Sequence, residues 1–146
     1  MHGFTLVELL VVLAILVIVA ALAIPFVYSW QTSSDLYTDA DTLTQILRRA
    51  RHQAVTGQNQ KAWGVYFDSA NHQFILFAGG SFSSRETEFD QAFDYPESFN
   101  LTTDFGEEIY FSAYTGQASA SGMVTLAAGD QSEQILISRY GKIEKN

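Results

Sequence analysis

The sequence predicts an α+β fold in which one long N-terminal helix packs against a mostly antiparallel β-sheet head. Residues 9–27 form an unbroken apolar run, and apolar residues at helical spacing continue from 36 to 54. Beyond Gly57 the pattern changes to short runs rich in β-branched and aromatic residues, separated by turn-forming residues. A chain of 146 residues has room for one such head.

The apolar run predicts a transmembrane helix over residues 4–28. It contains only Leu, Val, Ala, Ile, Phe and Pro, and with Leu6 and Val7 it reaches the ~20 residues that cross a bilayer. Tyr28 and Trp30 follow, at the position where aromatic side chains commonly meet the lipid headgroups. No Lys or Arg precedes Arg48, and Asp residues follow the run, so we expect a cytoplasmic N-terminus and a head on the far side.

Residues 29–57 are expected to form the amphipathic half of the same helix. The apolar stripe is widened by Ile46 and ends before Gly57, whose left-handed conformation would stop the helix; its members are Leu36, Ala40, Leu43, Leu47, Ala50 and Ala54. Pro25 cannot donate a hydrogen bond to the carbonyl of Ala21, which predicts a kink in the membrane half. The stripe should pack beneath the head.

Glu8 is the one ionisable residue inside the apolar segment. A carboxylate costs ~2.5–3.5 kcal/mol at the centre of a membrane helix and less near its end, so it usually marks a partner or a function. The alternative is an interfacial Glu whose carboxylate lies among the lipid phosphates. The functional interpretation requires a cation nearby in an assembled state.

Arg48, Arg49 and Arg51, with His52, form the one basic cluster. At the end of the helix these side chains would complement the negative end of the helix dipole. The alternative is a phosphate-binding patch, but the chain's net charge of −8 argues against nucleic acid as a partner.

Residues 58–146 are expected to form the β-rich head. Strands are predicted at 63–67, 74–78, 109–114, 123–127 and 134–139, with a hairpin turn over 68–71. The acidic segment 81–108 between them is expected to be a loop, anchored to the core by its aromatic residues Phe89, Phe93, Tyr95, Phe99 and Phe105. This loop could bind a partner subunit or an exported substrate, or could simply be solvated.

The sequence shows no constellation for catalysis, and we expect no enzymatic activity and no cofactor. No histidine lies near an evident nucleophile, and phosphate-binding glycine loops, zinc spacings and paired-carboxylate motifs are missing. Asp90, Asp94 and Glu97 could offer oxygen ligands to calcium, although they follow no EF-hand pattern. The chain has no cysteine, so disulfide and thiol chemistry are excluded.

The segment 3–10, Gly-Phe-Thr-Leu-Val-Glu-Leu-Leu, resembles the prepilin processing signal of type IV pilins and type II secretion pseudopilins. The resemblance implies a leader over residues 1–3, cleavage between Gly3 and Phe4 by prepilin peptidase, and methylation of the new Phe4 amine. It also implies that Glu8 of one subunit pairs with the Phe4 ammonium of its neighbour during filament assembly. At ~4 Å such a pair contributes up to ~4 kcal/mol at an effective dielectric of 20.

The alternative for this segment is an ordinary secretory signal peptide. Ala21-Leu22-Ala23 fits the small-x-small pattern of general signal peptidase, which would leave Ile24 at the mature N-terminus. This interpretation has no account of Glu8.

The stretch 43–53 and the ending 135–143 resemble GspH/FimT-type minor pilins and pseudopilins. The resemblance implies a pilin fold and a single-pass protein of the bacterial inner membrane that enters a type II secretion pseudopilus or a type IV pilus. Its partners would be other pilins and the prepilin peptidase/methyltransferase. The alternatives are a DNA-binding tip pilin for DNA uptake and a major pilin.

Overall fold

The computed structural model describes the backbone of residues 5–146 and the side chains of residues 5–21 and 34–146. The chain divides into two compact units, Met1–Ser34 and Asp35–Asn146. One helix, α1 (Leu6–Val55), accounts for nearly all of the first unit and begins the second.

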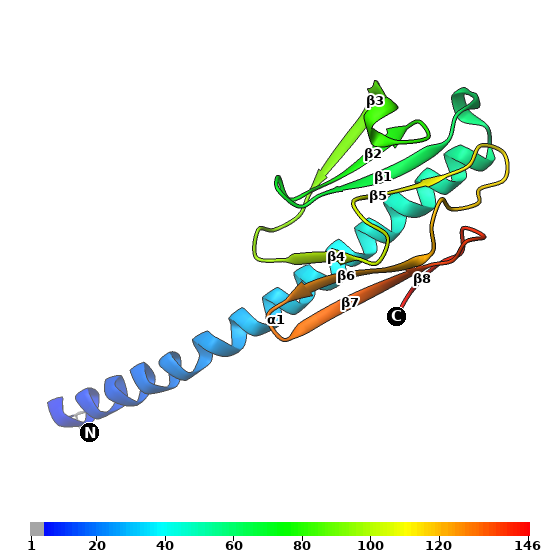
Figure 1. Ribbon diagram of the computed structural model, residues 1–146. Helices are drawn as coiled ribbons and strands as arrows, with labels where there is room; N and C mark the ends of the chain where they lie inside the picture. The colour runs from blue at the N-terminus through cyan, green and yellow to red at the C-terminus, as the bar shows by residue number, and fades with distance from the viewer. Residues whose placement is uncertain (1–4) are drawn as a thin grey trace. The chain divides into compact units, whose positions relative to one another are not determined.

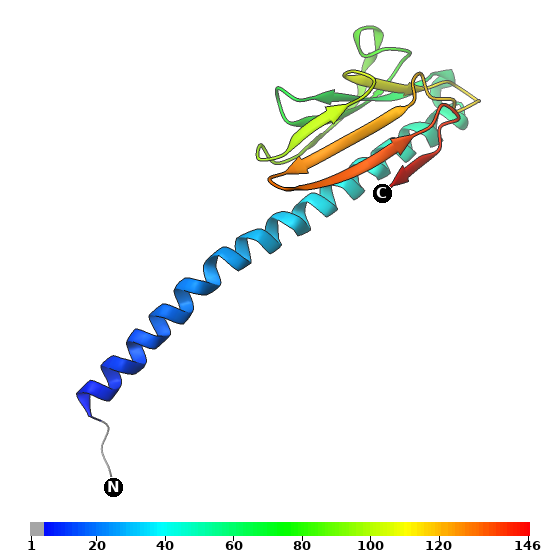
Figure 2. The ribbon, with the colours of Figure 1, turned by 60° about the horizontal axis from the view of Figure 1, so that its bottom comes forward.

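The second unit contains eight strands in two antiparallel sheets. The first sheet has the order β3-β2-β1-β5 and the second has the order β4-β6-β7-β8. Their bounds are β1 (Trp63–Asp68), β2 (Gln73–Ala78), β3 (Glu86–Asp94), β4 (Asn100–Thr103), β5 (Glu108–Phe111), β6 (Gly122–Ala128), β7 (Gln131–Ile137) and β8 (Ile143–Lys145), with short 3-10 helices at Gln58–Gln60 and Phe82–Ser84. Figures 1 and 2 show both sheets lying along the C-terminal part of α1. The predicted α+β fold with one helix against an antiparallel head is confirmed.

The predicted helical stripe forms the centre of the core. Leu43, Leu47, Ala50 and Ala54 are completely buried, and Leu36 is 2% exposed. They pack with apolar side chains from both sheets in one cluster, because a helix with an apolar face on one side must bury that face against another layer. Gly57 has a φ of 66°, as a left-handed helix stop requires.

The hairpin between β1 and β2 follows the sequence prediction. Trp63 pairs with Ala78 and Asp68 pairs with Gln73. The Asp68 carboxylate accepts hydrogen bonds from the backbone N–H of Asn71 at 3.1 Å and from its side-chain amide at 2.8 Å, which closes the turn.

The expectation of a loop over 81–108 is wrong. This segment holds β3 and β4 and leads into β5, and β3 forms the edge of the first sheet. Glu86, Glu88 and Asp94 occupy exposed positions of β3, where charge is tolerated and protects a sheet edge from pairing with other chains. The five aromatic residues of the segment do anchor it to the core as predicted.

Candidate functional site

The first turn of α1 places Glu8 in a helix-capping arrangement. The backbone N–H of Glu8 donates to the Thr5 side-chain oxygen at 3.3 Å, and the N–H of Leu9 donates to the Thr5 carbonyl at 3.3 Å. Thr5 is therefore the N-cap residue of α1. Glu8 follows three residues later, in the first turn, where a carboxylate is stabilised by the positive end of the helix dipole. Sequence reasoning missed this role, although the Thr-x-x-Glu spacing signals it.

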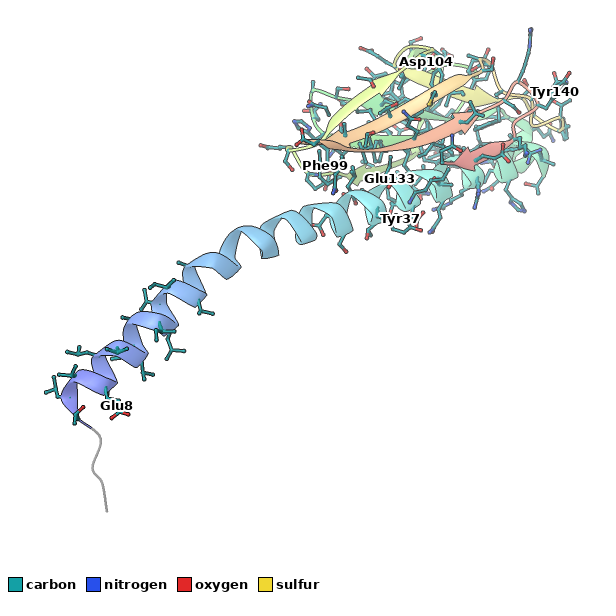
Figure 3. All side chains as sticks on the ribbon, turned by 90° about the horizontal axis from the view of Figure 1, so that it is seen from below. Glu8, Tyr37, Phe99, Asp104, Glu133 and Tyr140 are labelled. Atoms are coloured by element: carbon teal, nitrogen blue, oxygen red, sulfur yellow. The ribbon has the colours of Figure 1, made fainter. Side chains whose placement is uncertain are left out.

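The Glu8 side chain is exposed and forms no ion pair with any residue that the structure describes (Figure 3). Around it, every large apolar side chain from Leu6 to Val19 is between 49% and 76% exposed. Because these residues follow one another along the helix, the apolar surface covers all its sides. Glu8 is the one ionisable group in that surface over residues 5–21.

Three expectations about this segment lie wholly or partly beyond what the structure describes. Gly3 and Phe4, the predicted cleavage and methylation positions, are outside the described residues. Pro25 lies within α1, but its side chain is outside the described residues, and the kink stays a prediction. Within the part of the chain that the structure describes, no helix combines the length and the hydropathy needed to cross a bilayer.

The predicted basic cluster does not form a single patch. Arg48, Arg51 and His52 line a pocket of about 430 Å³ together with Val55 and residues 141–143. Arg49 lies instead in a separate groove with Ile46 and Phe93, because it is turned about 100° around the helix from Arg48. The pocket depends on the loop before β8, 90 residues away in sequence, which periodicity along the helix cannot reveal.

The arginines of the cluster also differ from the other cations in their partners. Lys61 pairs with Glu86, Arg85 with Asp90, Lys142 with Glu144, and Lys145 with Asp41 and Glu133. Among the described residues, no carboxylate forms an ion pair with Arg48, Arg49, Arg51 or Arg139. Four of the eight Lys and Arg residues thus have no carboxylate partner among the described residues.

The candidate calcium ligands do not come together. Asp90 pairs with Arg85 at 2.7 Å, and Asp94 accepts a hydrogen bond from the Gln73 side chain at 2.7 Å. Over the described residues, no group of three or more His, Cys, Asp or Glu side chains is placed to hold a metal ion. Calcium binding by Asp90, Asp94 and Glu97 has no geometric support here.

Comparison with known proteins gives one family model and two solved structures. Residues 1–24 match the model of the prokaryotic N-terminal methylation motif. No curated protein sequence matches the chain.

The two structures share the fold. The type IV minor pilin FimU of Pseudomonas aeruginosa superposes with a TM-score of 0.59 at 17% identity, covering 76% of this chain and 92% of FimU. The minor pseudopilin EpsH of the Vibrio cholerae type 2 secretion system gives a TM-score of 0.59 at 11% identity, covering 77% of this chain and 96% of EpsH. The chain thus carries the prokaryotic N-terminal methylation motif at its start and shares the fold of a type IV minor pilin and of a minor pseudopilin.

Proposed function

We propose that this chain is a minor subunit of a type II secretion pseudopilus or a type IV pilus and has no enzymatic activity. The observation that carries the proposal is the apolar surface around all sides of α1 from Leu6 to Val19, interrupted by Glu8. A helix that is apolar all round needs lipid or other helices to cover it. The membrane would cover this apolar surface before assembly, and the helices of neighbouring subunits would cover it in the filament.

Glu8 would act in assembly. Cleavage after Gly3 creates an ammonium at Phe4, and the exposed Glu8 carboxylate of a neighbouring subunit would neutralise it as the helices stack. An unpaired charge left in an apolar bundle is strongly unfavourable, so the pair would also select the register of packing. Thr5 caps the helix locally and presents the carboxylate in the first turn.

The organisation that follows is a leader over 1–3, a membrane and filament-core helix over 4–28, an amphipathic half over 29–57 and a head over 58–146. The subunit would reside in the bacterial inner membrane with its head on the periplasmic or extracellular side. Both solved relatives are named as minor subunits, which favours a minor role here over a major one. The abundance of the chain in sheared filaments measures that difference.

The decisive experiment is the substitution Glu8→Gln in cells that assemble the filament. Gln is neutral but keeps the helix propensity and nearly the shape of Glu. Cleavage and methylation at Phe4, read by mass spectrometry, should be unchanged, while incorporation into sheared filaments should fall at least about tenfold, a loss that 1.4 kcal/mol already produces.

Asp35→Asn is the matched control, because it removes the same charge from an exposed position of α1 beyond the apolar segment. Its incorporation should equal that of the wild type. Wild-type incorporation of Glu8→Gln would remove the assembly role, and a mature N-terminus at Ile24 would remove the whole proposal, because Glu8 would then be lost with a signal peptide.

A further inference from the structure

The pocket at the C-terminal end of α1 holds a guanidinium that nothing else in the fold uses. Arg51 forms no ion pair with a described residue, and its Nε atom is fully buried without a hydrogen-bond partner. Buried donors are almost always satisfied, so an unsatisfied one on a permanently charged side chain calls for an explanation. The backbone turns at Gly116 and Gly141 cover this atom, whereas Arg51 also lines the pocket, so an anion that enters the pocket would meet its unpaired charge.

The fold holds the Arg51 side chain in place through two glycines. A Cβ atom added to Gly141 would lie 2.7 Å from Arg51 Nε and 3.1 Å from its Cδ, and one added to Gly116 would lie 3.5 Å from its Cγ. Both glycines have a positive φ, 65° at Gly116 and 77° at Gly141, a conformation that other residues rarely adopt. The two turns therefore close their backbones on the arginine stem, and a guanidinium held in this way loses little entropy on binding.

A second cation converges on the same pocket. Arg48 stands one helical turn before Arg51, and its Nη2 makes a long hydrogen bond of 3.5 Å to the Ile143 carbonyl. Two like charges three residues apart on a helix repel each other, and a bound anion would relieve that repulsion. Lys142 at the rim is paired with Glu144 at 2.6 Å, so the two arginines carry the recognition.

The walls of the pocket narrow the class of ligand. Val55, whose side chain is 42% exposed, contributes apolar surface beside the two arginines. A planar carboxylate matches the fork of an arginine with two parallel hydrogen bonds, and the apolar walls suit an aliphatic neighbour of that carboxylate. A nucleic-acid strand would need a continuous basic track, and the separation of Arg49 into another groove interrupts it.

We propose that this pocket binds the carboxylate of an acidic side chain, flanked by an apolar residue, from the head of a neighbouring subunit in the filament. This inference rests on the proposed function, because it is the filament that places another pilin head against this one. The fixed Arg51 would pair with the carboxylate, Arg48 would reinforce the positive field, and Val55 would cover the apolar neighbour of that carboxylate.

The first test measures binding of a short probe to the full chain in non-ionic detergent micelles. The probe is the capped tripeptide acetyl-Leu-Glu-Leu-amide, and acetyl-Leu-Gln-Leu-amide is its neutral match. The titration is followed by the NMR signals of the arginine Nε–H groups. The Arg51 signal should shift when the Glu peptide is added and should not shift when the Gln peptide is added. Arg51→Gln should weaken binding at least about tenfold, and Arg51→Lys should fall between, because Lys keeps the charge and loses the fork.

Arg49→Gln is the matched control. Arg49 lies two residues before Arg51 in the sequence but lines a different groove, so removing its charge should leave the affinity for the peptide unchanged. Thermal unfolding of each variant separates a binding defect from a loss of folding. Equal losses in Arg49→Gln and Arg51→Gln, no binding of the Glu peptide, or tighter Arg51-dependent binding of a single-stranded oligonucleotide or of inorganic phosphate would overturn the proposal.

The second test identifies the source of the carboxylate. A photo-crosslinking amino acid in place of the exposed Lys142 should, in assembled filaments, join this chain to an acidic segment of another pilin subunit. The crosslink should weaken with Arg51→Gln and persist with Arg49→Gln. A crosslink that maps outside any pilin subunit, or that ignores Arg51, would overturn the assignment.

The two proposals fail separately. The peptide titration needs no filament, so a negative result there removes the pocket and leaves the Glu8 experiment standing. Wild-type assembly of Glu8→Gln would remove the filament role and leave a measured peptide affinity in place.

Discussion

The Nζ atom of Lys145 lies 2.9 Å from the Asp41 carboxylate, so the last strand of the head is tied to α1 across 104 residues of sequence. The same ammonium donates to the Tyr37 carbonyl at 3.2 Å and lies 3.3 Å from the centroid of the Tyr37 ring. Glu133 on β7 lies 3.6 Å from this ammonium, so Lys145, which is part of β8, contacts both α1 and β7. Figure 3 labels Tyr37 and Glu133.

Lys145→Ala should therefore lower the free energy of unfolding by about 1–2 kcal/mol, the usual effect of losing hydrogen bonds to a charged and mostly covered group. The side chain of Lys145 is 13% exposed, so solvent screens it only in part. Urea denaturation followed by circular dichroism measures the change. Lys142→Ala is the control: its pair with Glu144 is 69% and 50% exposed, and its removal should cost less than about 0.5 kcal/mol. Equal effects of the two substitutions would show that Lys145 does not join these elements.

Asp39→Asn should stabilise the chain at neutral pH. Burial raises the pKa of the Asp39 carboxyl above its ordinary value of 3.8, and the neighbouring Asp35 carboxylate raises it further. A carboxyl whose folded pKa is raised favours the folded state while it is protonated, and this advantage is lost as the pH rises from 3.8 through the folded pKa. The variant avoids that loss, so its melting temperature should exceed the wild-type value at pH 7, and the difference should vanish as the pH falls below 3.8.

Asp68→Asn should act in the opposite direction. Hydrogen bonds from the Asn71 side chain and from the turn backbone hold the pKa of the Asp68 carboxyl below its ordinary value. The ionised Asp68 carboxylate therefore contributes to the stability of the folded state above pH 3.8, and this contribution is lost as the pH falls through the depressed folded pKa. The variant should melt at a lower temperature than the wild type at pH 7 and lose this difference in acid. Thermal unfolding measured between pH 2 and pH 7, in steps of about one pH unit, tests both aspartates together. If the melting temperatures of the two variants changed with pH in the same way, both assignments would be contradicted.

Gly141→Ala should destabilise the head strongly. The new Cβ would clash with the Gly116 carbonyl oxygen, and Gly141 has a φ of 77°. The backbone strain alone is about 1–2 kcal/mol, and the clash adds to it. Gly129→Ala separates the two costs, because Gly129 has a φ of 60° and nothing within 4 Å of the added atom. Equal losses of stability would mean that the close approach of the two turns carries no energy of its own.

Leu43→Ala tests whether the helical stripe holds the head together. Leu43 is completely buried among side chains of the core, so its truncation leaves a cavity and should cost about 2–5 kcal/mol. Leu136→Ala removes the same atoms from a side chain that is 43% exposed and should cost much less. A small effect at Leu43, measured by chemical denaturation, would place the stability of the head in the sheets instead.

The sequence anticipated the elements whose patterns are local and missed those that depend on their neighbours. The strands β1, β2 and β6 were predicted within a residue or two, because each is a run of apolar residues between turn signals. The edge strand β3 was missed, because its acidic exposed face resembles a loop until a partner strand supplies its hydrogen bonds. The three-residue β8 has no pattern of its own and exists through its pairing with β7.

By itself, the sequence determined the long helix, its buried stripe, the single carboxylate in its apolar half and the methylation motif, because each follows from periodicity or from residues within one turn of each other. The tertiary structure alone determined which of the arginines share a pocket. Neighbours on a helix point in directions 100° apart, so whether Arg48, Arg49 and Arg51 act together depends on which distant turn closes over each face. Here the turns at Gly116 and Gly141 close on Arg51, and Arg49 is left on another side.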